Sequence, residues 1–181
     1  ALQPDHLQTL MLLGRWYSSA NQPEKAIEMF ERAIQSAPHS EEPYFHLGLL
    51  YHQQLRLDDA AQTIQKGLNV VPTSPVGYYY LGRVQTDQKL YPEAVKSFEK
   101  ALTLQPAFDH AYLALGDLYE QMNSPDQAIE VYKRLLEIGD PYHREAHYRL
   151  VQIYAQKKDY DTALSMLGNL LKRDPSDLEA H

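Results

Sequence analysis

The chain contains no cysteine, and this absence limits the chemistry that it can perform. Disulfide bonds, thiolate nucleophiles and cysteine-based zinc sites are all excluded. The sequence also lacks a run of about 18 consecutive apolar residues, so we expect no insertion into a membrane. We expect a soluble protein of the cytoplasm or the periplasm, and the sequence does not decide between these two compartments.

An excess of positive charge is absent as well. The 181 residues include 17 Lys and Arg against 24 Asp and Glu, a formal net charge of -7, and both signs are interspersed. A surface for nucleic acid or for anionic lipid would require a basic patch. We therefore expect no nucleic acid as a partner. The apolar fraction of 44% and the charged fraction of 23% are typical of a folded globular chain.

What the chain does contain is a tandem repeat with a period of 34 residues. The clearest copy lies at 112–119, where aromatic residues flank a Leu-Gly pair at a distance of three residues on each side. The repeats span 7–40, 41–74, 75–108, 109–143 and 144–177, and the fourth is one residue longer than the others. Position numbers below count from the first residue of each repeat.

Two positions of the repeat are small. Position 8 is glycine in four repeats: Gly14, Gly48, Gly82 and Gly116. Position 20 is alanine in all five: Ala26, Ala60, Ala94, Ala128 and Ala163. A glycine inside a helix costs roughly 0.5–1 kcal/mol relative to alanine. We therefore interpret both positions as structural, with two helices crossing too closely for a Cβ at position 8, opposite the alanine at position 20.

Each repeat predicts two helices, because apolar residues recur at helical spacing in both halves. Proline is expected in the first turn of the second helix, at Pro23, Pro92 and Pro125. A further proline near the end of four repeats, at Pro38, Pro72, Pro106 and Pro175, should terminate that helix. Trp16 falls at an apolar position of the first helix, and we expect it in the core between adjacent repeats.

This period and these recurring residues resemble the tetratricopeptide repeat family over nearly the whole chain. The resemblance implies an all-α solenoid of antiparallel helix pairs, about five repeats and roughly ten helices, stacked into a right-handed superhelix as a single domain spanning 1–181. Residues 1–6 would be the tail of a preceding repeat, and 178–181 the start of a further one. We therefore expect a segment excised from a longer array, whose uncapped ends could associate with other copies.

The resemblance also implies where a partner would bind. Family members hold extended peptides or helices in a concave groove, through positions 2, 5, 9 and 12 of the first helices. The residues that we predict to contact a partner are Met11, Arg15, Phe45, Leu49, His52, Val76, Tyr79, Arg83, Leu113, Asp117, Tyr148 and Gln152. Position 5 is apolar in every repeat, which would suit a partner with apolar side chains. The alternative is that these side chains pack on neighbouring repeats.

One subclass of the family grips the C-terminal carboxylates of chaperone tails. It uses Lys and Asn at positions 5 and 9 of one repeat, Asn at position 6 of the next, and Lys and Arg at positions 2 and 6 of the third. No three successive repeats carry this set here, and the last frame reads Tyr79, Arg83, Ala114, Glu145 and Arg149. We therefore do not expect recognition of chaperone tails.

Motifs for catalysis are lacking too. The sequence has no Gly-rich phosphate loop, no Gly-x-Ser-x-Gly elbow and no His-Glu-x-x-His. His143 and His147 are four residues apart, but we expect His143 in the loop before a helix and find no third ligand, so we predict no metal site and no cofactor. The sequence thus predicts a non-enzymatic scaffold for protein–protein interaction. The alternatives are an accessory region of a larger enzyme or secretion assembly, such as a glycosyltransferase or an outer-membrane exporter, and self-assembly through the ends.

Overall fold

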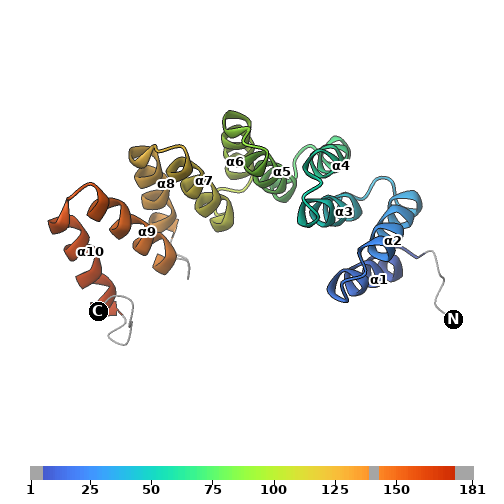
Figure 1. Cartoon of the computed structure of the whole chain (residues 1–181), viewed down its shortest axis with the longest axis horizontal. Helices are drawn as coiled ribbons and strands as arrows, with labels where there is room; N and C mark the ends of the chain where they lie inside the picture. The colour runs from blue at the N-terminus through green and yellow to red at the C-terminus, as the bar shows by residue number, and fades with distance from the viewer. Residues whose placement is uncertain (1–5, 139–142, 174–181) are drawn as a thin grey trace. The chain divides into compact units, whose positions relative to one another are not determined.

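The computed structural model is helical throughout its described part, which comprises residues 6–138 and 143–173. The described residues form ten helices, labelled in Figure 1. In chain order they are α1 (Leu7–Ser19), α2 (Pro23–Ser36), α3 (Glu42–Gln53), α4 (Leu57–Val70), α5 (Pro75–Asp87), α6 (Tyr91–Leu104), α7 (Asp109–Gln121), α8 (Pro125–Ile138), α9 (His143–Gln156) and α10 (Tyr160–Arg173). The all-α fold and the expected number of helices are confirmed. Residues 1–5 and 178–181, which we expect to belong to neighbouring repeats, lie outside the described residues.

The helices gather into two compact units, which are described separately. Unit 1 spans residues 1–105 and holds α1 to α6, and unit 2 spans 106–181 and holds α7 to α10. Each odd-numbered helix packs against the helix that follows it, and the short connection makes the pair antiparallel (Figure 1). Consecutive pairs then stack, with α3 on α2 and α5 on α4 in unit 1, and α9 on α8 in unit 2. The expectation of one continuous solenoid domain stays a prediction.

The turn between the two helices of a repeat has the same conformation every time. Position 15 is in the left-handed region in all five repeats: Asn21, Leu55, Lys89, Asn123 and Lys158, with φ between 54° and 62°. In the third repeat, the N–H of Leu90 donates to the carbonyl of Gln85 at 2.9 Å, and that of Lys89 donates to the carbonyl of Thr86 at 2.9 Å. This is the Schellman closure of a helix C-terminus, which satisfies carbonyls that the helix leaves free.

Prolines delimit the second helices as the sequence predicts. Pro23 and Pro125 are the first residues of α2 and α8, and Pro92 is the second residue of α6. The missing N–H of proline is harmless there, because the first N–H groups of a helix have no partner inside it. The residues that cap the ends of α2, α4 and α6 each directly precede a proline: Ala37, Val71 and Gln105. Pro175 lies outside the described residues.

The glycines at position 8 mark a close crossing of the two helices of a repeat, as expected. Their nearest neighbour, however, is the large side chain at position 24. The pairs are Gly14 with Phe30, Gly48 with Ile64, Gly82 with Phe98, and Gly116 with Tyr132. A Cβ on Gly14 would lie 2.5 Å from Cε1 of Phe30. The close approach is therefore confirmed, but the space is taken by an aromatic or aliphatic side chain rather than by the alanine at position 20.

The position of Trp16 contradicts the expectation that it belongs to the core. Its side chain is 59% exposed, and Leu13 on the same helix is 38% exposed. The residues equivalent to Trp16 in the next two repeats, Leu50 and Val84, are 5% and 0% exposed. The physical reason is that α3 and α5 are covered by the second helix of the preceding repeat, whereas none of the described helices covers this face of α1.

Candidate functional site

Two of the predicted groove residues belong to the core of unit 1. Met11 is 3% exposed and Phe45 is 5% exposed. A Cβ on Gly77 would lie 2.5 Å from Cζ of Phe45, and one on Gly67 would lie 2.8 Å from its Cε1. The ring of Phe45 therefore fills space left open by two glycines of α4 and α5. These two side chains are buried by packing, as the alternative interpretation of position 5 expects, and they offer little surface to a partner.

The other predicted residues of unit 1 are more accessible. Leu49, His52 and Tyr79 are half-buried, and Arg15, Val76 and Arg83 are exposed. The guanidinium of Arg83 lies 5.9 Å from the ring centroid of Tyr79. Nε2 of His52 lies 2.5 Å from Oδ2 of Asp87, a link between α3 and α5. This face thus combines apolar surface with charged side chains from successive first helices.

A pocket of about 210 Å³ opens between α3 and α5. It is lined by Glu41, Glu42, Phe45, His46, Leu49, Val76 and Tyr80. Three predicted groove residues, Phe45, Leu49 and Val76, are brought together here. The sequence did not predict that two glutamates and a histidine would join them. The sequence feature that could have indicated this is spacing: positions 1 and 2 lie four and three residues from position 5, and position 6 lies four residues from position 2.

His46 forms a polar wall of the pocket. Its ring stacks on Phe30 with a centroid distance of 5.5 Å and an interplanar angle of 14°. Its Nε2 lies 3.8 Å from Oε1 of Glu42. Burial lowers the pKa of His46 from its usual 6.5; Glu42 opposes this shift and Arg15 adds to it. At neutral pH the imidazole is therefore uncharged, and the glutamates determine the charge of the lining.

Glu41 stands directly before α3 and contributes an unsatisfied acceptor. Its Oε2 is buried, and this atom finds no hydrogen-bond partner within the part of the chain that the structure describes. The side chain does not cap α3 either. A buried carboxylate oxygen without a donor is unfavourable, because it has lost its hydration and gained nothing in return. Glu41 therefore lines the pocket with a carboxylate whose hydrogen-bonding capacity is incompletely used by the described residues.

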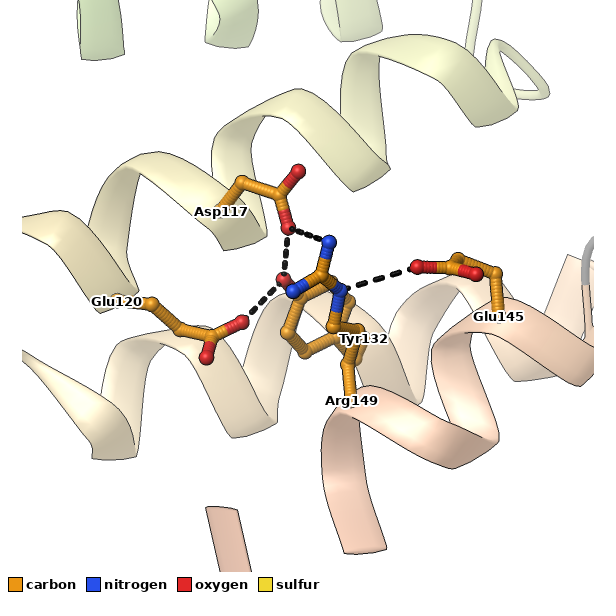
Figure 2. Close-up of polar contacts among 5 residues, drawn as sticks. All are labelled: Asp117, Glu120, Tyr132, Glu145 and Arg149. Atoms are coloured by element: carbon orange, nitrogen blue, oxygen red, sulfur yellow. Dashed lines mark hydrogen bonds and ion pairs between the residues drawn. The ribbon is translucent and has the colours of Figure 1, made fainter. Parts of the chain in front are cut away.

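In unit 2, Asp117 is held by a network from three helices (Figure 2). The hydroxyl of Tyr132 on α8 lies 2.7 Å from Oδ1 of Asp117 and 2.7 Å from Oε1 of Glu120, both on α7. Arg149 on α9 places Nη2 3.4 Å from Oδ1 of Asp117, and its Nε donates to Glu145 at 3.0 Å. Burial, and then the two carboxylates, raise the pKa of Tyr132 far above its usual value of 10.0. Asp117 is thus already engaged within the unit.

The remaining predicted residues of unit 2 are Leu113 and Tyr148, which are half-buried, and Gln152, which is exposed. The guanidinium of Arg144 lies 5.6 Å from the ring centroid of Tyr148. The network around Tyr132 was not predicted from the sequence. The sequence feature that could have indicated this network is the tyrosine hydroxyl at position 24, where the first three repeats have Phe30, Ile64 and Phe98.

A second hollow, of about 530 Å³, lies among α2, α3 and α4 in unit 1. Its lining includes Glu31, Tyr51, Asp59 and Lys66, and several of these groups have internal partners. Asp59 bonds to Nε of Arg56 at 2.8 Å, and the guanidinium of that arginine lies 4.2 Å from the ring centroid of Tyr51. We therefore regard the pocket between α3 and α5, with its unpaired carboxylate, as the better candidate site.

Across residues 6–138 and 143–173, no three His, Asp or Glu side chains are grouped so as to hold a metal ion. His143 is the first residue of α9, so its expected position in a loop was wrong. Among the helices that the structure describes, none combines the length and the apolar character needed to cross a membrane.

The fold and the candidate site define a helical repeat protein with a surface pocket between stacked helix pairs. The model of the tetratricopeptide repeat family matches residues 1–79, 85–140 and 126–181. The chain therefore belongs to the tetratricopeptide repeat family. No curated protein sequence matches it significantly.

Several solved structures share the fold over nearly the whole chain. The crystal structure of MamA is 22% identical and has a TM-score of 0.79, with 98% of this chain and 96% of MamA covered. YrrB, described as a TPR protein with an unusual peptide-binding site, is 21% identical with a TM-score of 0.69, covering 98% and 91%. PilF of Pseudomonas aeruginosa is 22% identical with a TM-score of 0.75, covering 98% and 81%. At these identities the likeness shows the fold alone.

Proposed function

We propose that this chain is a non-catalytic scaffold that binds an extended peptide or a helix of a partner protein, on the face that the first helices of unit 1 form. Domains of this family generally mediate protein–protein interactions. The observation that carries the proposal is the pocket between α3 and α5, in which Leu49 and Val76 stand beside buried Phe45. The peptide-binding site described for YrrB, which shares the fold, supports the proposal by analogy.

The size of the pocket favours a side chain of a partner over a small-molecule ligand. Sites for drug-sized molecules usually enclose roughly 300–1,000 Å³. The pocket here has about 210 Å³, which suits one side chain of an extended peptide. Leu49 and Val76 border the opening, and the 39% exposure of Val76 leaves apolar surface for the neighbouring residues of such a peptide.

Selection of random displayed peptides on the immobilised full chain tests this proposal. We expect enriched peptides to lose binding to the double variant Leu49→Ser/Val76→Ser, because it removes apolar contact from the pocket opening and leaves the buried core intact. The control is Leu90→Ser, since Leu90 is 45% exposed and lies in the turn before α6, outside the pocket lining. The proposal fails if no peptide is enriched, or if the double variant retains the same peptides.

A second candidate function is association of copies through faces that no described helix covers. On α1, Leu12 and Trp16 are 60% and 59% exposed, and on α10, Leu164 is 66% exposed. The residue equivalent to Leu164 in the first repeat, Ile27, packs against the core of unit 1. A helix pair of a second copy would cover such faces as neighbouring repeats do. Sedimentation equilibrium should then show an apparent mass that rises with protein concentration. The rise should be smaller for the variant Trp16→Glu. A constant monomer mass would exclude this candidate.

A further inference from the structure

We infer that the pocket between α3 and α5 recognises a basic–apolar peptide segment, in which an apolar side chain enters the pocket and an adjacent lysine or arginine side chain pairs with Glu41. This inference rests on the proposed function, because it specifies the chemistry of the partner that binds the same face. The cation that pairs with Glu41 is a side chain of the partner protein.

The apolar half of the segment is specified by the walls of the pocket. Phe45 and Tyr80 meet edge to face, with ring centroids 6.4 Å apart and an interplanar angle of 61°. Leu49 and Val76 complete the apolar lining. An aliphatic or aromatic side chain placed against these groups gains from the burial of its apolar surface.

The cationic half is specified by Glu41. Glu41 is half-buried and lines the pocket, and its buried Oε2 makes no hydrogen bond to the described residues. A charged donor makes a stronger bond to a carboxylate than a neutral donor does. Because this carboxylate is partly dehydrated and unpaired, a lysine or arginine side chain placed beside it in the pocket compensates a charge that lost hydration on folding.

Among the described residues, no neighbouring group forms an ion pair with this carboxylate. Glu42 adds a second negative charge to the lining, and its Oε1 lies 3.8 Å from Nε2 of His46. His46 is uncharged at neutral pH because burial lowers its pKa. Arg15, the cation that also acts on His46, is exposed on α1 and is not part of the pocket lining. The pocket therefore carries net negative charge, which favours a basic segment and disfavours an acidic one.

The overall charge of the protein acts in the same direction. A formal net charge of -7 attracts a basic peptide at long range and repels an acidic one. This attraction is screened by salt, whereas the contact with a dehydrated carboxylate is screened less. Affinity for a basic segment should therefore fall when salt is raised, while a preference for Lys or Arg over neutral residues persists.

Selection of random N-acetylated peptides on the full chain tests the inference, with wild type, Glu41→Gln and Glu93→Gln compared in parallel. Acetylation excludes the terminal ammonium as the source of the cation. Glu93 is the matched control, since it is an exposed glutamate in the first turn of α6. We expect wild type and the control to enrich peptides with Lys or Arg next to an apolar residue, and Glu41→Gln to lose the preference for the basic residue.

The strongest wild-type peptide is then synthesised and its affinity measured by fluorescence anisotropy. We expect Glu41→Gln to weaken it by about tenfold or more, the usual effect of losing a charge-assisted hydrogen bond. Glu42→Gln should have a smaller effect, because this glutamate is 54% exposed. Circular dichroism should show the same helical content for all variants.

The possible failures can be told apart. If peptides are enriched and depend on Leu49 and Val76 but carry no Lys or Arg, or bind Glu41→Gln as tightly as wild type, the inference is overturned and the proposed function stands. If no peptide is enriched on wild type, the proposed function fails and the inference fails with it.

Discussion

The hydroxyl of Tyr132 lies 2.7 Å from Oδ1 of Asp117, and the same hydroxyl is 2.7 Å from Oε1 of Glu120. A tyrosine hydroxyl has one hydrogen to donate, so it bonds one of these carboxylates at a time. Arg149 approaches the same oxygen, Oδ1 of Asp117, with Nη2 at 3.4 Å, and supplies the compensating positive charge (Figure 2). The hydroxyl therefore joins α7 and α8, and the arginine joins α9 to them.

Tyr132→Phe should destabilise the protein by about 2 kcal/mol, because it deletes a hydrogen bond to a charged group and retains the ring that fills the space at Gly116. A phenyl ring fits this position, since Phe30 and Phe98 occupy it in other repeats. The free energy of unfolding in urea measures the effect. The control Tyr160→Phe, at a 59% exposed tyrosine, should change it by less than about 0.5 kcal/mol. Equal effects of the two variants would contradict the structural role of the hydroxyl.

The same contacts predict how stability depends on alkaline pH. The pKa of Tyr132 is raised in the folded state, so its contribution is complete below the usual value of 10.0 and is lost as the pH rises above it. The unfolded chain then releases a proton that the folded chain retains. Between about pH 9 and 11, the free energy of unfolding of wild type should fall more steeply than that of Tyr132→Phe. Parallel curves would contradict this.

His46 predicts a second pH dependence, at the acidic side. Its pKa is lowered in the folded state. The contribution of His46 to stability is therefore complete above the usual value of 6.5 and is lost as the pH falls toward the lowered pKa. His46→Gln should flatten the decline in the free energy of unfolding between about pH 6.5 and 5. The exposed histidine His39 provides the control, and His39→Gln should leave the decline as it is in wild type.

Two glycine-to-alanine variants should have opposite effects. Gly82→Ala places a Cβ 2.7 Å from Cε1 of Phe98 and should lower the free energy of unfolding by about 1–3 kcal/mol. Gly168 lies inside α10, and apart from its chain neighbours and the backbone of its own helix, no atom of the described residues lies within 4 Å of its Cβ position. Gly168→Ala should raise stability by up to about 1 kcal/mol, since alanine favours the helix. Thermal and urea unfolding measure both, and a loss of stability in both variants would refute the distinction.

The recurring turn predicts a stabilising substitution at Leu55. This leucine has a φ of 60° and is 80% exposed. Leu55→Gly should raise the free energy of unfolding by about 1 kcal/mol, because glycine adopts the left-handed conformation without a steric penalty. In contrast, Lys96→Gly at an exposed site inside α6 should lower it by about 1 kcal/mol. Destabilisation by both variants would show that the left-handed conformation of Leu55 carries no steric penalty that glycine relieves.

The sequence predicted the bounds of second helices such as α6 well, because their ends have a local cause. Pro92 opens α6 and the residue before Pro106 closes it, so neighbouring residues alone determine both boundaries. The left-handed turn at Leu55, Lys89 and Lys158 was not predicted, since these residues do not favour that conformation by themselves. There the packing of two helices determines the backbone.

The site was predicted less well, because burial at position 5 depends on packing between repeats. Phe45 is buried since Gly67 and Gly77 leave room for its ring, and both glycines belong to other helices. The glycines at these two positions were the sequence feature that could have indicated the burial of Phe45. The network around Tyr132 joins residues of three helices, and its hydrogen bonds follow from side-chain orientations that a repeat pattern does not contain.

Binding of a partner peptide to the face of the first helices can be mapped by following amide chemical shifts while an enriched peptide is added to the labelled chain. We expect the largest shifts in α3 and α5, at pocket residues such as His46, Leu49 and Val76. Shifts confined to α2 and α4, around the hollow that includes Glu31 and Lys66, would contradict it.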